Sequence, residues 1–195
     1  MSTLLMLLSS WPAAADGGAM SFPAAVQFET GDTWVHEDSK FRLFGVQACL
    51  RDTRYRLPDG EEGDCGLRSI GALAALFSTN TIACQPVGTA KDDATFVVCA
   101  AEVGDAALDV GTALISSGFA FAAVQPSGAA VLPAYAVAEG VAKEDGSGLW
   151  AGQFVHPSAL LLRGEQSEVS EVEFEGLQDG GDLHHSQRLP GAAVE

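Results

Sequence analysis

Basic residues are scarce in this chain. Of 195 residues only 10 are Lys or Arg, against 26 Asp or Glu, and the formal net charge is −16. A nucleic-acid binder gains affinity mainly from Lys and Arg side chains that displace counterions from phosphates. The charge balance therefore opposes binding to a polyanion, although it leaves room for a local basic cleft, and we expect protein partners instead.

Long apolar runs and metal-type cysteine pairs are also missing. No stretch of 18 apolar residues occurs, so we expect no transmembrane span. The cysteines at positions 49, 65, 84 and 99 form no C-x-x-C pair, which argues against a zinc ribbon or a thioredoxin-like motif. We see no internal repeat.

The N-terminal sequence indicates export. "MSTLLMLLSSWPAAADGG" has a short apolar run followed by three alanines, which resembles the end of a secretory signal with an A-x-A cleavage site. No Lys or Arg precedes the run, so residues 1–20 also fit a flexible N-terminus or a start placed inside a longer signal. We expect a periplasmic or secreted protein. The even cysteine count then predicts two disulfides, with four buried free thiols as the alternative.

The first half of the chain predicts strands and then a helix. Residues 24–29, 33–37 and 41–47 have the composition of strands, with short turns between them. Residues 50–64 form an irregular loop rich in Pro, Gly and charge. Asp64 is placed to cap a helix that ends near Asn80. Its apolar positions at helical spacing predict one buried face, made of Leu67, Ile70, Leu73, Ala74 and Phe77.

The second half predicts a hairpin and two more helices. The strands 81–87 and 95–103 flank a polar turn, and Cys84 and Cys99 are about equidistant from its middle. These two cysteines should therefore face each other and form one disulfide, which leaves Cys49 and Cys65 for the other. Further predictions are a helix over about 106–117 that stops at Gly118, a strand over 119–124, a helix from Pro133 to about Glu144, and the closing segment "GSGLWAGQF".

Residues 164–195 differ in composition from the rest. They hold eight acidic residues and one basic residue, Arg188, with no apolar period. We predict a mostly disordered acidic tail, in which His184-His185 is too little for a metal site. The folded domain, residues 24–163, is then an α+β domain. The element order favours a five-stranded barrel with about three helices packed outside, for which the OB-fold is the closest architecture.

Residues 26 to about 158 resemble the staphylococcal-nuclease-like (thermonuclease) family. The segments that carry the resemblance are "TGDTWVHEDSKFRLFGV", the helix after "DCG", "CQPVGTAKDDATFVVC" and "AYAVAEGVAKEDGSGLWAGQF". The resemblance implies an OB barrel with helices. It also implies descent from enzymes that use calcium to hydrolyse DNA and RNA.

The resemblance assigns roles to only part of the catalytic set. Asp32 matches a metal-ligating aspartate and Arg42 the first phosphate-binding arginine. Gln47 and Leu50 stand where the family has a metal-binding aspartate and the glutamate base, and Ala94 replaces its second arginine. The other aspartate of the opening motif is Thr30.

The first expectation is therefore a non-catalytic member of that family without a cofactor, exported and used as a binding or assembly module. One alternative is an active calcium-dependent phosphodiesterase in which Glu61, Glu62 or Asp92 replaces the missing ligands. Another is an accessory subunit of a larger complex, docked through the acidic tail or through residues 154–163.

Three further features have a functional and a structural interpretation. Arg51, Arg54 and Arg56 form either an anion-binding patch or a loop neutralised by nearby acids, namely Asp52, Asp59, Glu61, Glu62 and Asp64. Trp34 and Trp150 are either stacking platforms or packing residues. Asp92-Asp93 is either a cation site or ordinary turn chemistry.

Overall fold

The computed structural model describes residues 18–163, and the signal-like segment before residue 18, the acidic tail and His184-His185 lie outside this range. The described residues fall into two units that divide after Pro157. The first unit is a mixed α+β domain with a curled β-sheet. Its helical elements number four among the described residues, where about three were expected.

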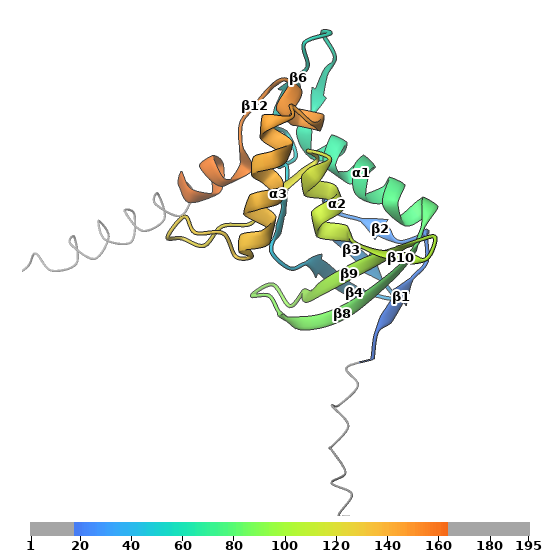
Figure 1. The fold of residues 1–195 in the computed structure, drawn as a ribbon. Coiled ribbons are helices and arrows are strands. Elements are labelled where there is room, and N and C mark those ends of the chain that lie inside the picture. The colour runs from blue at the N-terminus through green and yellow to red at the C-terminus, as the bar shows by residue number, and fades with distance from the viewer. Residues whose placement is uncertain (1–17, 164–195) are drawn as a thin grey trace, which may run out of the picture. The chain divides into compact units, whose positions relative to one another are not determined.

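The largest sheet contains seven strands and curls around the core (Figure 1). Its strand order is β1 (Met20–Phe22), β8 (Thr81–Thr89), β9 (Thr95–Val103), β4 (Ser39–Leu43), β3 (Thr33–His36) and β2 (Gln27–Phe28), with β10 (Ala106–Asp109) also paired to β9. All of these pairs are antiparallel except β4 with β9. The sheet begins at Met20, ahead of the domain start expected at residue 24.

Two smaller sheets extend the domain at the other end. One pairs β5 (Val46–Ala48) with β11 (Ala120–Ala122), and the other has the order β12 (Gln153–Phe154), β6 (Arg54–Arg56) and β7 (Glu62–Asp64). The loop expected over residues 50–64 thus contains two strands. The described part of the chain therefore has more strands than the five expected.

Local capping chemistry places the helices. They are α1 (Cys65–Thr79), α2 (Val110–Ser116), α3 (Pro133–Glu144) and the 3-10 helix η1 (Gly148–Ala151). The Asp64 carboxylate accepts a hydrogen bond from the Leu67 N–H at 2.8 Å, which confirms the predicted cap. Pro133 lies in the first turn of α3, where its missing N–H costs nothing.

Three predicted elements are wrong in detail. Residues 41–47 do not form one strand, because a turn at Phe44-Gly45, with Gly45 at φ +76°, separates β4 from β5. Residues 106–109 pair with β9 instead of starting the second helix. The buried face of α1 is rotated, since Leu67 is 52% exposed while Leu73 and Phe77 are in the core.

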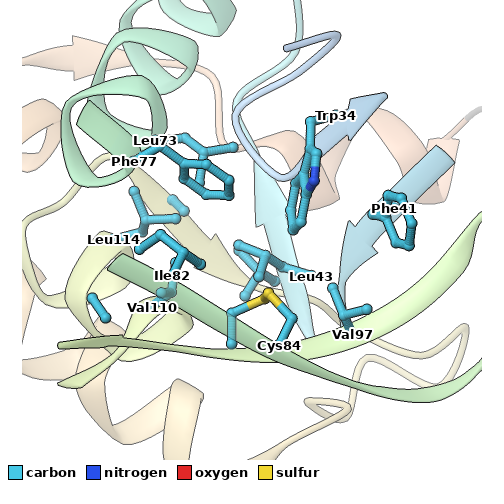
Figure 2. Close-up of a cluster of buried hydrophobic side chains, with 14 of the residues drawn as sticks. Trp34, Phe41, Leu43, Leu73, Phe77, Ile82, Cys84, Val97, Val110 and Leu114 are labelled. Atoms are coloured by element: carbon cyan, nitrogen blue, oxygen red, sulfur yellow. A yellow bond between two sulfur atoms is a disulfide. The ribbon is translucent and has the colours of Figure 1, made fainter. Parts of the chain in front are cut away.

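The core lies between the curled sheet and the helices. Figure 2 shows Trp34 and Leu43 from the sheet facing Leu73 and Phe77 of α1, with Ile82 and Cys84 on β8 below them. Trp34 is fully buried, so it packs in the core and is no stacking platform. A second cluster joins the smaller sheets to η1 through Tyr55, Phe121 and Leu149.

Both predicted disulfides are present. Cys84 and Cys99 lie directly opposite each other in the β8–β9 ladder, and Cys49 is bonded to Cys65 at the start of α1. All four cysteines are buried. Disulfides of this kind are typical of proteins in an oxidising compartment. In residues 18–163, every helix is too short or too polar to cross a membrane.

Candidate functional site

The Asp32 carboxylate lies at a buried corner of the domain, in the turn before β3. The side chain is only 6% exposed. Oδ1 accepts hydrogen bonds from the hydroxyls of Thr30 and Thr33, and Oδ2 accepts the backbone N–H of Ala48 at 2.8 Å. Asp32 therefore fastens the end of β5 to the turn between β2 and β3.

Arg42 extends the same network toward the surface. It lies opposite Thr33 in the β3–β4 ladder, and its Nε donates to the Thr33 hydroxyl oxygen at 3.1 Å. Its two terminal nitrogens donate to the two carboxylate oxygens of Asp92, at 3.3 and 2.7 Å. The Arg42 guanidinium thus already holds a bidentate carboxylate, the geometry in which arginine binds anions best.

Asp92 belongs to the turn between β8 and β9. The turn is closed by the Ala90 N–H bonded to the Ala94 carbonyl, and Asp93 has a left-handed φ of 62°. The hydrogen bonds from Arg42 hold the pKa of the Asp92 carboxyl below its usual range. Burial raises this pKa, but by less, because the side chain is partly exposed. Asp92 is therefore ionised at neutral pH and paired.

Calcium does not fit this corner. The ion takes 6–8 oxygen ligands, mostly carboxylates and carbonyls. Asp32 already accepts hydrogen bonds on both oxygens, and both Asp92 oxygens are occupied by Arg42. In the described range, residues 18–163, no cluster of three or more His, Cys, Asp or Glu side chains has the spacing of a metal site.

The three positions at which the resemblance implies lost catalytic groups have local roles in the fold. Gln47 lies on β5, and its side-chain amide donates to the carbonyl of Ala48 at 2.9 Å. Leu50 follows β5 and is half-buried. Ala94 is fully buried immediately before β9.

Of the three carboxylates expected to replace the missing ligands in an active enzyme, Glu61 and Glu62 bind side chains away from the Asp32 corner, and only Asp92 lies at it. Glu61 accepts the Tyr55 hydroxyl at 2.7 Å and pairs with Arg68 at 3.4 Å. Glu62 pairs with Arg54 and Arg56. The structure therefore brings Asp92 to the corner beside Arg42, whereas Glu61, just before β7, and Glu62, on β7, bind other side chains.

The loop arginines do not form one patch. Arg51 faces Asp64 at 3.7 Å, whereas Arg54 and Arg56 face Glu62 across the β6–β7 hairpin. Of the neutralising acids that the sequence indicated, Asp64 and Glu62 pair with these arginines, and Glu61 pairs with Arg68. Arg54 and Arg56 share one carboxylate, that of Glu62.

Sequence reasoning missed a pair between Glu139 and His156. On α3, Glu139 Oε2 accepts the backbone N–H of Ala122 at 2.6 Å, and Oε1 lies 3.1 Å from His156 Nε2. Burial by itself raises the pKa of the Glu139 carboxyl, but the contacts with His156, the Ala122 N–H and Lys143 outweigh it and lower that pKa. No sequence motif joins two residues at this separation.

Trp150 and His156 belong to an aromatic cluster around Phe121. The ring centroids of Phe121 and Trp150 are 5.6 Å apart, and those of Phe121 and His156 are 4.6 Å apart. Lys143 Nζ lies 5.5 Å from the centre of the Trp150 ring. Trp150 therefore packs within this aromatic cluster, in agreement with its interpretation as a packing residue.

In comparisons with known proteins, no protein-family model matches this chain, and no curated protein matches it.

Proposed function

We propose that this domain is a non-catalytic member of the staphylococcal-nuclease-like family, built on an OB-type barrel, that acts as an exported binding or assembly module. The observation that carries the proposal is the state of the corner: Asp32 and Asp92 are both bound to donors of the protein itself. A hydrolytic site needs carboxylates that are open to a metal or to water.

The missing groups account for a large loss of rate. A positioned general base contributes about 10²–10⁴-fold to a reaction. Leu50 stands at the position that the resemblance gives to that base, and its side chain cannot take a proton. A preorganised charge donor contributes about 10²–10³-fold more. Ala94 stands where the second arginine is expected, and Arg42 is already paired with Asp92.

Other features support the remaining parts of the proposal. The curled sheet, with helices against it, is consistent with an OB-like fold. Two buried disulfides fit an exported protein. A net charge of −16 favours a protein partner over a nucleic acid, because phosphates would be repelled. Barrel surfaces of this class accept many kinds of partner, so the module can bind without chemistry.

The test is a degradation assay on plasmid DNA and on RNA, with calcium and with a chelator. We expect no cleavage above the level of an Asp32→Ala variant under either condition. A double variant, Gln47→Asp with Leu50→Glu, restores two carboxylates while leaving the buried Ala94 untouched, and is a positive arm for calcium binding. Calcium-dependent cleavage by the unmodified protein that is lost with Asp32→Ala contradicts the proposal and supports the phosphodiesterase alternative.

A further inference from the structure

An open groove lies beside β6 and β12. Figure 1 shows these two strands at the end of the domain away from β3 and β4. Its volume is about 380 Å³. It is lined by Arg54, Tyr55, Arg56, Glu62, Gln153, Phe154 and Val155. The groove thus combines cationic, amide and apolar groups from three strands of one small sheet and the residue that follows it.

The strand geometry places the two arginines together. Along β6 the exposed residues alternate with a buried one, so Arg54 and Arg56 point to the same face while Tyr55 points into the core. Two successive residues on one face of a strand lie about 7 Å apart. One anion can therefore contact both guanidinium groups.

The positive charge of this face exceeds the negative charge that meets it. Glu62 is the carboxylate bonded to both arginines. The neighbouring acids are used elsewhere: Asp64 caps α1, Glu61 accepts the Tyr55 hydroxyl, and Asp59 accepts the Glu61 backbone N–H. Among the residues that line the groove, Arg54 and Arg56 against Glu62 leave one positive charge.

Arg54 is the arginine with donors to spare. Arg56 donates to Glu62 Oε2 through Nε and Nη2, at 3.2 and 2.9 Å. Arg54 reaches Glu62 Oε1 at 3.4 Å through one nitrogen, and its side chain is 76% exposed. A guanidinium has five N–H donors, so most of the donors of Arg54 face solvent in the groove.

Val155 supplies the apolar side chain beside the arginines. Phe154 is paired with Tyr55 and its ring stacks on Phe121 toward the core, whereas Val155 after it is 49% exposed and lines the groove. Gln153 adds a side-chain amide that can donate or accept. A ligand that met these groups would carry an anion at one end and an apolar group at the other.

We propose that this groove binds a small anionic ligand, a carboxylate or a phosphate monoester with an attached aromatic or aliphatic group. Arg54 binds the anion with its forked donors, Arg56 lies beside it on the same face, and Val155 contacts the apolar part. Glu62 holds the two arginines in place in the absence of ligand and competes with it. This site goes beyond the proposed function and is independent of whether the Asp32 corner is catalytic.

The test uses the full chain and four probes: phenyl phosphate, 3-phenylpropanoate, inorganic phosphate and acetate. Binding is measured by calorimetry and by NMR shifts of the backbone amides. We expect the two aromatic probes to bind more tightly than the corresponding ions and to shift the amides of residues 153–155. Comparing the phosphate and carboxylate arms decides which anion is preferred.

Matched variants separate a site from a general charge effect. Hydrogen bonds to charged groups contribute about 1.5–3 kcal/mol, so Arg54→Gln should weaken phenyl phosphate binding about tenfold or more. Lys91→Gln, which removes one charge from the β8–β9 turn, should change it less than about twofold. Glu62→Gln should tighten it about threefold or more, because a competing carboxylate is removed. A purely structural role for the arginines would give no such gain.

Several outcomes would overturn the proposal. The first is a dissociation constant weaker than about 10 mM for every probe. The second is an equal loss in Arg54→Gln and Lys91→Gln, which would indicate non-specific attraction. The third is that the probes shift backbone amides of the unmodified protein outside residues 153–155. This measurement needs no variant. Val155→Ser should weaken phenyl phosphate and leave inorganic phosphate unchanged, and a reversal of that order would also count against the site.

Discussion

Replacing Asp32 distinguishes a structural carboxylate from a metal ligand. In the structure its two oxygens accept hydrogen bonds from Thr30, Thr33 and the buried N–H of Ala48. A carboxylate satisfied in this way stabilises the fold. A ligand carboxylate held for a cation that is absent would repel its neighbours, and its removal would stabilise the protein.

The size of the effect follows from the partners. Asp32→Ala leaves the buried Ala48 N–H without a hydrogen-bond acceptor, which costs about 1–3 kcal/mol. The Thr33 hydroxyl loses a further bond of about 0.5–1.5 kcal/mol, while the half-buried Thr30 hydroxyl can turn to water. We expect a loss of about 3 kcal/mol in the free energy of unfolding. Asp32→Asn keeps an acceptor for Ala48 and should cost about 1 kcal/mol.

The assay is urea denaturation at pH 7 in a chelating buffer, repeated with calcium. Glu102→Gln removes the same charge from an exposed position on β9 and should change stability by less than about 0.5 kcal/mol. The reasoning is refuted if Asp32→Ala stabilises the chelated protein or costs less than about 1 kcal/mol. Calcium should leave the unfolding midpoint of the unmodified protein unchanged, because a ligand stabilises only the state that binds it.

Three further predictions concern the rest of the chain. Replacing either cysteine pair by alanine opens a loop with a sequence separation of 15 or 16 residues and should cost about 3 kcal/mol, read from denaturation curves, with mass mapping of non-reduced peptides to verify the pairings. Glu139→Gln should cost about 2 kcal/mol at pH 7, because it weakens the hydrogen bonds that the Glu139 carboxylate makes with the Ala122 N–H and with His156. The pKa of Glu139 is lowered in the folded protein, so this stabilisation is complete above the unfolded pKa near 4.3 and is lost as the pH falls through the folded pKa. The difference in the free energy of unfolding between the two proteins should therefore shrink as the pH falls below about 4.3. Ending the chain after Arg163 should shift the melting temperature by less than about 2 °C, because the residues of both core clusters lie before Pro157. A larger drop in the melting temperature would show that the tail is part of the domain. Loss of a protein partner from a pull-down with the shortened chain would show that the tail binds that partner.

Elements with local end signals could be predicted from the sequence. The Asp64 cap, Pro133 in the first turn of α3 and the stop at Gly118, with φ +75°, each act within a few residues of the chain. The β8–β9 hairpin and its disulfide followed from the symmetry of Cys84 and Cys99 about a polar turn. These signals need no knowledge of distant parts of the chain.

The missed elements depend on distant partners. β6 has one inward residue, Tyr55, between two charged ones, so it carries no apolar period and is a strand because β7 and β12 pair with it. Residues 106–109 are compatible with a helix or a strand, and pairing with β9 decides between them. Leu67 fits the helical spacing of α1, yet the way α1 meets the sheet leaves it in solvent.

The candidate site was predictable only in part, for the same reason. Asp32 and Arg42 could be singled out by a resemblance in order and spacing. Asp92 stands 50 residues from Arg42 in the chain, and their bidentate pair exists because β9 runs parallel to β4 and carries its preceding turn to that end of the strand. No local pattern in the turn distinguishes a salt-bridge partner from an ordinary turn aspartate.

The same network explains how a corner can keep its charged residues without chemistry. Asp32 joins Ala48 on β5 to Thr33 on β3, and Thr33 orients Arg42, which in turn holds the β8–β9 turn through Asp92. Each link contributes to the fold whether or not a phosphate ever binds. On the proposed function, the carboxylate and the arginine stand in this chain because they connect strands. A base at position 50 or an arginine at position 94 would add no such connection, since Leu50 and the buried Ala94 already satisfy their surroundings through packing.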